Sequence, residues 1–183
     1  MFNFNEADEQ TSFDVIPAGT ICQLELSIRP CGAGEGGWLK RSKDGLSAML
    51  DCEFTVLEGH YARRKLWSNF TVEGPTEGHA KAASISNSRL RAILESAHGV
   101  KPSDKSEHAA AMRKVTGFDA FHGLRFVAKI GIDPARDGYP ARNTILDVVT
   151  PDRPQWKKLE QTLGGASAAS QPSVTTIARP AWA

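Results

Sequence analysis

The sequence has few cysteines and no long apolar run. Its three cysteines, Cys22, Cys31 and Cys52, form no Cys-x-x-Cys pair, which argues against a disulfide framework and against a zinc finger. No apolar run approaches the roughly 18 residues of a membrane-spanning helix. The first residues, Met1–Glu6, lack the basic and apolar regions of a secretory signal. We therefore expect a cytoplasmic protein without a membrane segment.

Signatures of catalysis are also lacking. The sequence contains no His-Glu-x-x-His, Gly-x-Ser-x-Gly or phosphate-loop motif, and its five histidines show no metal-ligand spacing. Asp51 and Glu53 are two residues apart on one expected strand face, which leaves a metal-free enzyme as an alternative, but such pairs arise often by chance. Cys52 lies on the apolar face and is expected in the core. We expect no enzyme activity, no cofactor and no metal.

The charge is unevenly distributed along an otherwise ordinary globular composition. Hydrophobic residues make up 40% and charged residues 23% of the 183 residues, and the net charge is +1. Residues 1–16 carry four acids and no cation, and we interpret them as an acidic arm. Residues 159–183 are rich in Gly, Ala, Ser and Pro, which is typical of a flexible tail. Residues 17–158 are expected to form one mildly basic domain, which is compatible with a polyanion partner.

Alternation of apolar and polar residues predicts five strands. The pattern has a period of two, which is typical of half-buried strands. It occurs at residues 20–28, 46–57, 64–72, 124–132 and 144–149. The link Glu58–Tyr61 is short, so the second and third strands are expected to form an antiparallel hairpin.

Helical spacing replaces this pattern between the third and fourth strands. Apolar residues lie on one helical face at Leu90, Ile93, Leu94 and Ala97. Ser86 or Ser88 is a candidate cap at the start and Gly99 at the end, and a second short helix is expected at about 104–115. The order β-β-β-α-β-β is that of the OB-fold, a five-stranded barrel that binds oligonucleotides and oligosaccharides. A β-sandwich with a helical insert is the alternative.

A glycine-rich loop between the first two strands is the first candidate site. It spans residues 29–45 and offers one aromatic ring and three cations, at Trp38, Lys40, Arg41 and Lys43. An aromatic ring can stack on a base and cations can contact phosphates, so the loop is a candidate nucleic-acid contact. A solvated hairpin tip with ordinary surface charge is the alternative interpretation.

A second basic cluster leads into the third strand. It consists of Arg63, Arg64, Lys65 and Trp67. Alternation places Trp67 on the polar face, where a stacked base would gain roughly 1–3 kcal/mol. Alternatively, Trp67 packs under the arm or in a dimer interface, and the acids of the neighbouring strand oppose phosphate binding. Arg125 and Lys129 of the fourth strand are further candidates, although a solvated strand face also explains them.

Several segments resemble a phage protein family formerly of unknown function. The segment Val56–Trp67, with the sequence VLEGHYARRKLW, is similar to "fevleGpykgRkl" of that family. Leu90–Gly99 resembles its helix, Phe121–Phe126 the approach to its fourth strand, and Asn143–Ile145 its last strand. The resemblance covers about residues 1–150. Family members belong to phage and prophage replication and recombination modules and are often described as single-stranded DNA-binding proteins.

The resemblance implies a single-stranded DNA-binding protein of a phage or mobile element. It would act in DNA replication or recombination in the host cytoplasm, with phosphate contacts and base stacking but without strong sequence preference. Replication or recombination proteins are further expected partners, and a homo-oligomer stays open. The alternative is an interaction module of such a complex with no direct nucleic-acid binding, using Trp67 as a hot spot. The last residues, Ala178–Ala183, lack the acidic tail of bacterial-type single-strand binders.

Overall fold

The computed structural model describes residues 5–6, 14–136 and 138–159, and within these it is mainly β with a helical insert, as predicted. Most of the expected arm and nearly all of the expected tail, including Trp182, lie outside the described residues. The elements are β1 (Ile21–Arg29), η1 (Glu35–Gly37), β2 (Leu39–Arg41), β3 (Ala48–Val56), β4 (Lys65–Glu73), α1 (Glu77–His98), α2 (Glu107–Met112), η2 (Phe118–Phe121), β5 (Arg125–Asp133) and β6 (Arg142–Val149).

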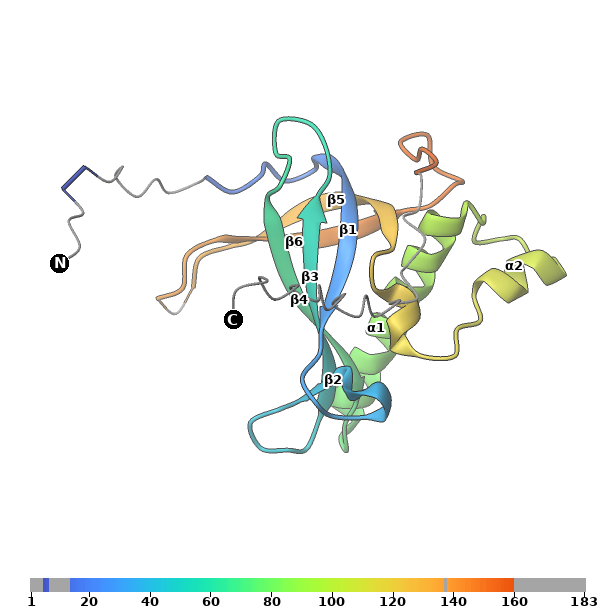
Figure 1. Cartoon of the computed structure of the whole chain (residues 1–183), viewed down its shortest axis with the longest axis horizontal. Helices are drawn as coiled ribbons and strands as arrows, with labels where there is room; N and C mark the ends of the chain where they lie inside the picture. Colours follow the sequence, from blue (N-terminus) through green and yellow to red (C-terminus); the bar gives the residue numbers. More distant parts are fainter. Residues whose placement is uncertain (1–4, 7–13, 137, 160–183) are drawn as a thin grey trace, which may run out of the picture.

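The six strands form a single antiparallel sheet, not the two packed sheets of a sandwich (Figure 1). Strand β3 pairs with β4, and it also pairs with β2 through Ala48–Leu50 and with β1 through Asp51–Val56. Strand β1 pairs in turn with β5, and β5 with β6. The predicted hairpin of the second and third strands is confirmed as β3–β4. The additional strand, β2, has only three residues, too few to show alternation.

The alternating residues divide as the sequence predicts. One face of β1 and β3 is buried, together with Leu66 and Phe70 of β4. The ring of Phe54 on this face lies 6.1 Å from that of Phe70 and 6.0 Å from that of Phe126. The other face carries polar residues in cross-strand rows. Two of these rows, Ser27–Glu53–Trp67 and Arg29–Asp51–Asn69, run across β1, β3 and β4. The sheet therefore presents a polar outer surface over a closed apolar core.

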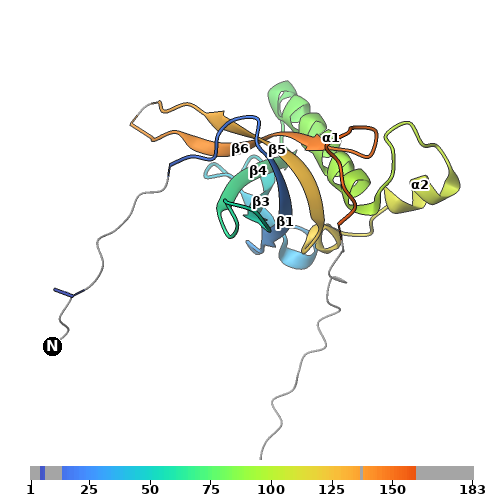
Figure 2. The same cartoon turned by 90° about the horizontal axis from the view of Figure 1, so that it is seen from above.

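Helix α1 packs against β4, β5 and β6 and completes the core with Leu90, Ile93 and Leu94 (Figure 2). It starts at Glu77, well before the predicted caps, because the hydroxyl of Thr76 accepts a hydrogen bond from the backbone N–H of His79. Its first two turns bury little apolar surface, so they show no apolar period. The predicted end is confirmed, since Gly99 caps the helix in a left-handed conformation.

The predicted OB-like barrel of five strands is not confirmed, because the sheet has six strands and is not closed. In the described part of the chain, no hydrogen-bonded ladder joins β4 to β6. Instead, side chains of both strands line a cavity between them. The hairpin of β5 and β6 extends past the rest of the sheet in both views (Figures 1 and 2).

The chain before β1 is hydrogen-bonded to β6. The side chain of Ile16 is buried in the core. Asn143 accepts a hydrogen bond from the Ile16 N–H and donates one to its carbonyl, both at 2.8 Å. These contacts fix the start of β6, and with it the base of the projecting hairpin. None of the described helices is long and apolar enough to cross a membrane.

Candidate nucleic-acid interface

A polar groove lies between β4 and the base of the β5–β6 hairpin, and its cavity measures about 310 Å³. Strands β1 to β4 contribute one wall and the two strands of the hairpin the other. The lining residues are Arg29, Lys40, Asp51, Trp67, Ser68, Asn69, Asp133, Arg142 and Thr144. The groove thus combines three cations, one indole and one amide, the side-chain types that contact phosphates and bases.

Asp51 organises the cations of the first wall. Its side chain is only 8% exposed, and its two oxygens accept hydrogen bonds from Arg29 at 2.6 Å and from Lys40 at 3.2 Å. Burial alone would raise the pKa of Asp51, but the hydrogen bonds from both cations outweigh it and hold the pKa below its usual value. The carboxylate is therefore ionised at neutral pH, and it holds the guanidinium and the ammonium beside one another.

Trp67 is the aromatic ring of the groove and is 51% exposed. Its Nε1 donates a hydrogen bond to Glu53 at 3.1 Å, on the directly opposite position of β3. Lys65 binds the other oxygen of Glu53 at 2.6 Å. The Lys65 hydrogen bond, aided by that of Trp67, lowers the pKa of Glu53 in spite of partial burial. The indole is thus held by one edge and keeps exposed ring surface on which a base can stack.

The hairpin supplies the second wall. Arg142 lies 3.1 Å from Asp133 across the base of the hairpin, and its side chain is 71% exposed. Towards the tip, Arg136 and Tyr139 exchange two backbone hydrogen bonds, and Tyr139 is 75% exposed. A second cavity, of about 520 Å³, lies beside these residues and Pro140. The hairpin therefore continues the groove outward with one more cation and one more aromatic ring.

The charge of the groove is positive but small. Each of its three cations is paired with a carboxylate, and the two carboxylates, of Asp51 and Asp133, leave a net charge of +1. The exposed pair of Arg142 with Asp133 is weak, so Arg142 can exchange its carboxylate for a phosphate at low cost. Arg29 and Lys40 stay paired with the buried Asp51 and would contact a phosphate through their exposed N–H groups. Electrostatic attraction to a polyanion is expected to be moderate.

Of the predicted site residues, the structure brings Lys40, Lys65 and Trp67 together on the outer face. It places Trp38 elsewhere, with its ring 5.8 Å from that of His122. Arg41 forms an ion pair with Glu73 at 3.2 Å. The remaining residue of the predicted loop site, Lys43, lies in the exposed turn between β2 and β3.

The other predicted cations are spread over the molecule. Arg63 and Arg64 lie in the turn between β3 and β4, where Arg64 donates to the carbonyl of Asp14 at 2.6 Å. On β5, Arg125 is paired with Glu25 of β1 at 2.9 Å. Lys129 lies further along β5, opposite Ile21 of β1. These residues do not line the groove.

Sequence reasoning missed five cationic, amide or aromatic residues that line the groove or the hairpin cavity, namely Arg29, Asn69, Arg136, Tyr139 and Arg142. Asn69 shares the outward alternation of Trp67, and this signal was available. Tyr139 and Arg142 lie in or beside the turn-rich stretch Asp133–Pro140 before the predicted last strand, and no alternation there singles them out.

No protein-family model matches the chain, and no curated protein is similar to it. Among the described residues, no group of three or more His, Cys, Asp or Glu side chains is placed to hold a metal ion. The groove is therefore the feature of the molecule that bears on function.

Proposed function

We propose that the protein binds single-stranded DNA without strong sequence preference, in a phage or mobile-element replication or recombination module. The observation that carries this proposal is the groove, in which Arg29, Lys40 and Arg142 converge beside the half-exposed indole of Trp67. Cations that follow a backbone, together with a ring that stacks on bases, are the combination used by sequence-tolerant single-strand binders. Such a protein would work in the host cytoplasm.

The strand order supports an OB-like architecture for this site. Without the short β2, the strands are β1, β3, β4, β5 and β6, with α1 between the third and the fourth. Strands β4 and β6 approach each other, with Cα atoms within 8 Å, although no ladder closes the seam. OB-folds are partly open barrels that bind oligonucleotides over their second and third strands and the adjoining loops. Here these strands are β3 and β4, which carry Asp51, Trp67 and Asn69.

The test is a fluorescence-anisotropy titration of a labelled oligo-dT with the full chain at two salt concentrations. The groove variant carries Arg29→Gln, Lys40→Gln and Arg142→Gln. We expect it to bind more weakly and to flatten the dependence of log K on log salt by up to about two units, since each phosphate contact on a single strand contributes roughly 0.7.

A matched control carries Lys81→Gln, Lys105→Gln and Lys114→Gln, three exposed cations on the helical side of the molecule. It loses the same charge but should keep the wild-type slope. Equal losses in both variants would mean general attraction without a site and would contradict the proposal. Absence of oligo-dT binding by the wild-type chain would favour the alternative, an interaction module without direct nucleic-acid contact.

A further inference from the structure

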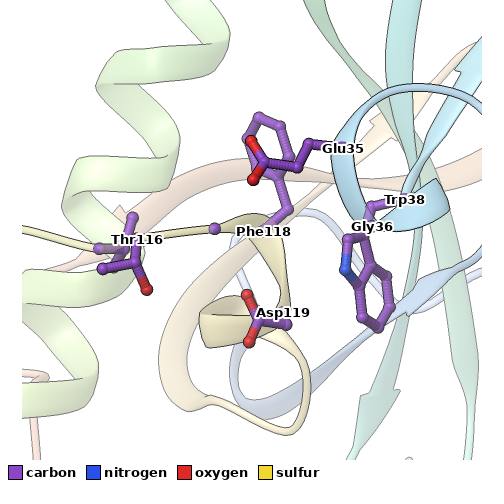
Figure 3. Close-up of a pocket in the computed structure, with 8 residues that line it drawn as sticks. Glu35, Gly36, Trp38, Thr116, Phe118 and Asp119 are labelled. Carbon is purple, nitrogen blue, oxygen red and sulfur yellow. The ribbon is translucent and has the colours of Figure 1, made fainter.

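Another cavity, of about 650 Å³, lies away from both the groove and the hairpin cavity and has a different chemistry (Figure 3). Glu35, Gly36 and Trp38 of the loop before β2 form one wall. The end of the link between α2 and η2 and the first two residues of η2, together residues 115–119, form the other. Figure 1 shows α2 and the β5–β6 hairpin projecting to opposite sides of the sheet, and Figure 2 shows the same separation. The cavity is therefore not part of the proposed DNA interface.

The cavity is acidic and aromatic. Figure 3 shows the carboxylates of Glu35 and Asp119 and the rings of Trp38 and Phe118 around a common space, with the Nε1 edge of the indole facing that space. No Lys or Arg lines the cavity, and within the described part of the chain neither carboxylate takes part in a salt bridge. Two negative charges without a counter-ion would repel a phosphate and attract a cation.

The indole of Trp38 packs against His122 and lies close to Gly36. Its ring packs at a tilt against His122, which in turn accepts a hydrogen bond from the Ile28 N–H of β1 at 3.2 Å. Gly36 has a positive φ of 69°, and a Cβ there would lie 2.9 Å from the indole. A residue with a side chain at this position would push the ring away, so the glycine allows the loop to close over Trp38. The cavity is therefore formed before any ligand arrives.

We propose that this cavity, which we call the acidic pocket, binds an arginine side chain presented by a peptide segment of a partner protein. A guanidinium stacks on aromatic faces and binds a carboxylate through two parallel hydrogen bonds, which matches two rings flanked by two carboxylates. A lysine ammonium offers no such plane. A nucleotide would bring its phosphates beside both carboxylates, so charge disfavours it. The pocket has room for more than one side chain, and the exposed Val115 provides an apolar contact for a neighbouring peptide residue.

The test follows the indole N–H signals of the ¹⁵N-labelled full chain by NMR, with Trp38→Phe used to assign the Trp38 signal. The probes are the blocked tripeptides Gly-Arg-Gly, Gly-Lys-Gly and Gly-Gln-Gly, and deoxycytidine. We expect saturable movement of the Trp38 signal with Gly-Arg-Gly in the millimolar range, weaker movement with Gly-Lys-Gly, and none with Gly-Gln-Gly. The isosteric pair Glu35→Gln and Asp119→Asn should weaken Gly-Arg-Gly binding about tenfold or more while leaving the remaining spectrum unchanged.

Arg142→Gln, in the DNA groove, serves as the matched control and should bind Gly-Arg-Gly like the wild type. Equal responses to the arginine and glutamine peptides, or no response to either, would overturn the proposal. A larger Trp38 response to deoxycytidine would instead make the cavity a base pocket and would also overturn it. None of these outcomes depends on whether the groove binds DNA, so the two proposals succeed or fail separately.

Discussion

Trp67 is the residue that is expected to stack on a base if the protein binds single-stranded DNA. Its indole is half exposed and held by a hydrogen bond to Glu53, so little of the core depends on it. We expect Trp67→Ala to cost roughly 1–3 kcal/mol of oligo-dT binding, because one stacked base is lost. Protein stability should change little, since removal of a surface ring leaves no cavity. Quenching of wild-type fluorescence by DNA tests stacking, anisotropy measures the affinity for oligo-dT, and urea unfolding measures the stability.

Other interpretations of Trp67 predict different results for the same variant. A loss of 3–5 kcal/mol of stability would make the ring part of the core. A folded variant that shifts towards monomer in sedimentation would place it in a protomer interface. Wild-type affinity in a folded variant of unchanged mass would exclude stacking.

Asp51 links the geometry of the groove to pH. Its pKa is held below the ordinary value of about 3.9, so its pairing with Arg29 and Lys40 stabilises the fold fully above that pH. This contribution is lost as the pH falls from about 4 through the folded-state pKa, because the unfolded chain binds the proton more readily. We expect Asp51→Asn to be less stable than the wild type at pH 7 and to show a shallower loss of stability on acidification. Urea unfolding at pH 7, 4 and 3 measures both effects, and parallel curves would contradict this role.

At the scale of elements, one serine joins the helix to the sheet. Ser96 of α1 is 2% exposed, and its hydroxyl donates to the carbonyl of Val149 at 2.7 Å and accepts from the N–H of Val127 at 3.1 Å. It thus satisfies backbone groups of β5 and β6 where their ladder ends. Ser96→Ala would leave both groups buried and unpaired, so we expect a loss of about 1–3 kcal/mol of stability.

Thermal and urea unfolding of Ser96→Ala test this role of the hydroxyl. Ser88→Ala is the matched control, because the hydroxyl of Ser88 is exposed and bonds only within its own helix, to the carbonyl of Ser84. The control should change stability by less than about 0.5 kcal/mol. Equal effects of the two substitutions would show that Ser96 has no special role in joining the helix to the sheet.

Elements were predictable wherever one face is apolar. Period-two alternation located five strands to within one or two residues, because each has a buried face. The start of α1 was not predictable in this way, since its first turns are exposed and the capping Thr76 lies outside the apolar stripe. Trp38 and Lys40 are two residues apart in the predicted loop, yet they line different cavities. Glycines with positive φ, among them Gly32, Gly34 and Gly36, turn the chain between β1 and Trp38. Such a turn leaves no periodic pattern in the sequence from which it could be predicted.

For the molecule as a whole, the groove forms because β4 and β6 come close together in space. No local sequence pattern predicts this, since the two strands are far apart along the chain. Trp67 and Arg142 are far apart along the chain, and they meet because the sheet curves until its two edges nearly touch. The gap left between these edges is the groove. The groove and the cavity beside Arg136 and Tyr139 share Asp133 and Arg142, so the hairpin continues the groove outward. A bound strand can therefore follow the outer face of β4 and then the hairpin.

This path predicts a dependence on oligonucleotide length. Tyr139, at 75% exposed, lies towards the hairpin tip, whereas Trp67 lines the groove itself. We expect Trp67→Ala to weaken binding of both a dT oligomer of about 4 nucleotides and one of about 16, the range of site sizes known for OB-folds. Tyr139→Ala should weaken only the longer one, by roughly 1–3 kcal/mol, because the shorter one ends before the hairpin tip. Leu146→Ala, at an exposed apolar position of β6, should alter neither. Equal sensitivity of both lengths to Tyr139→Ala would instead place the hairpin tip at the centre of the site, and the strand would then not begin in the groove.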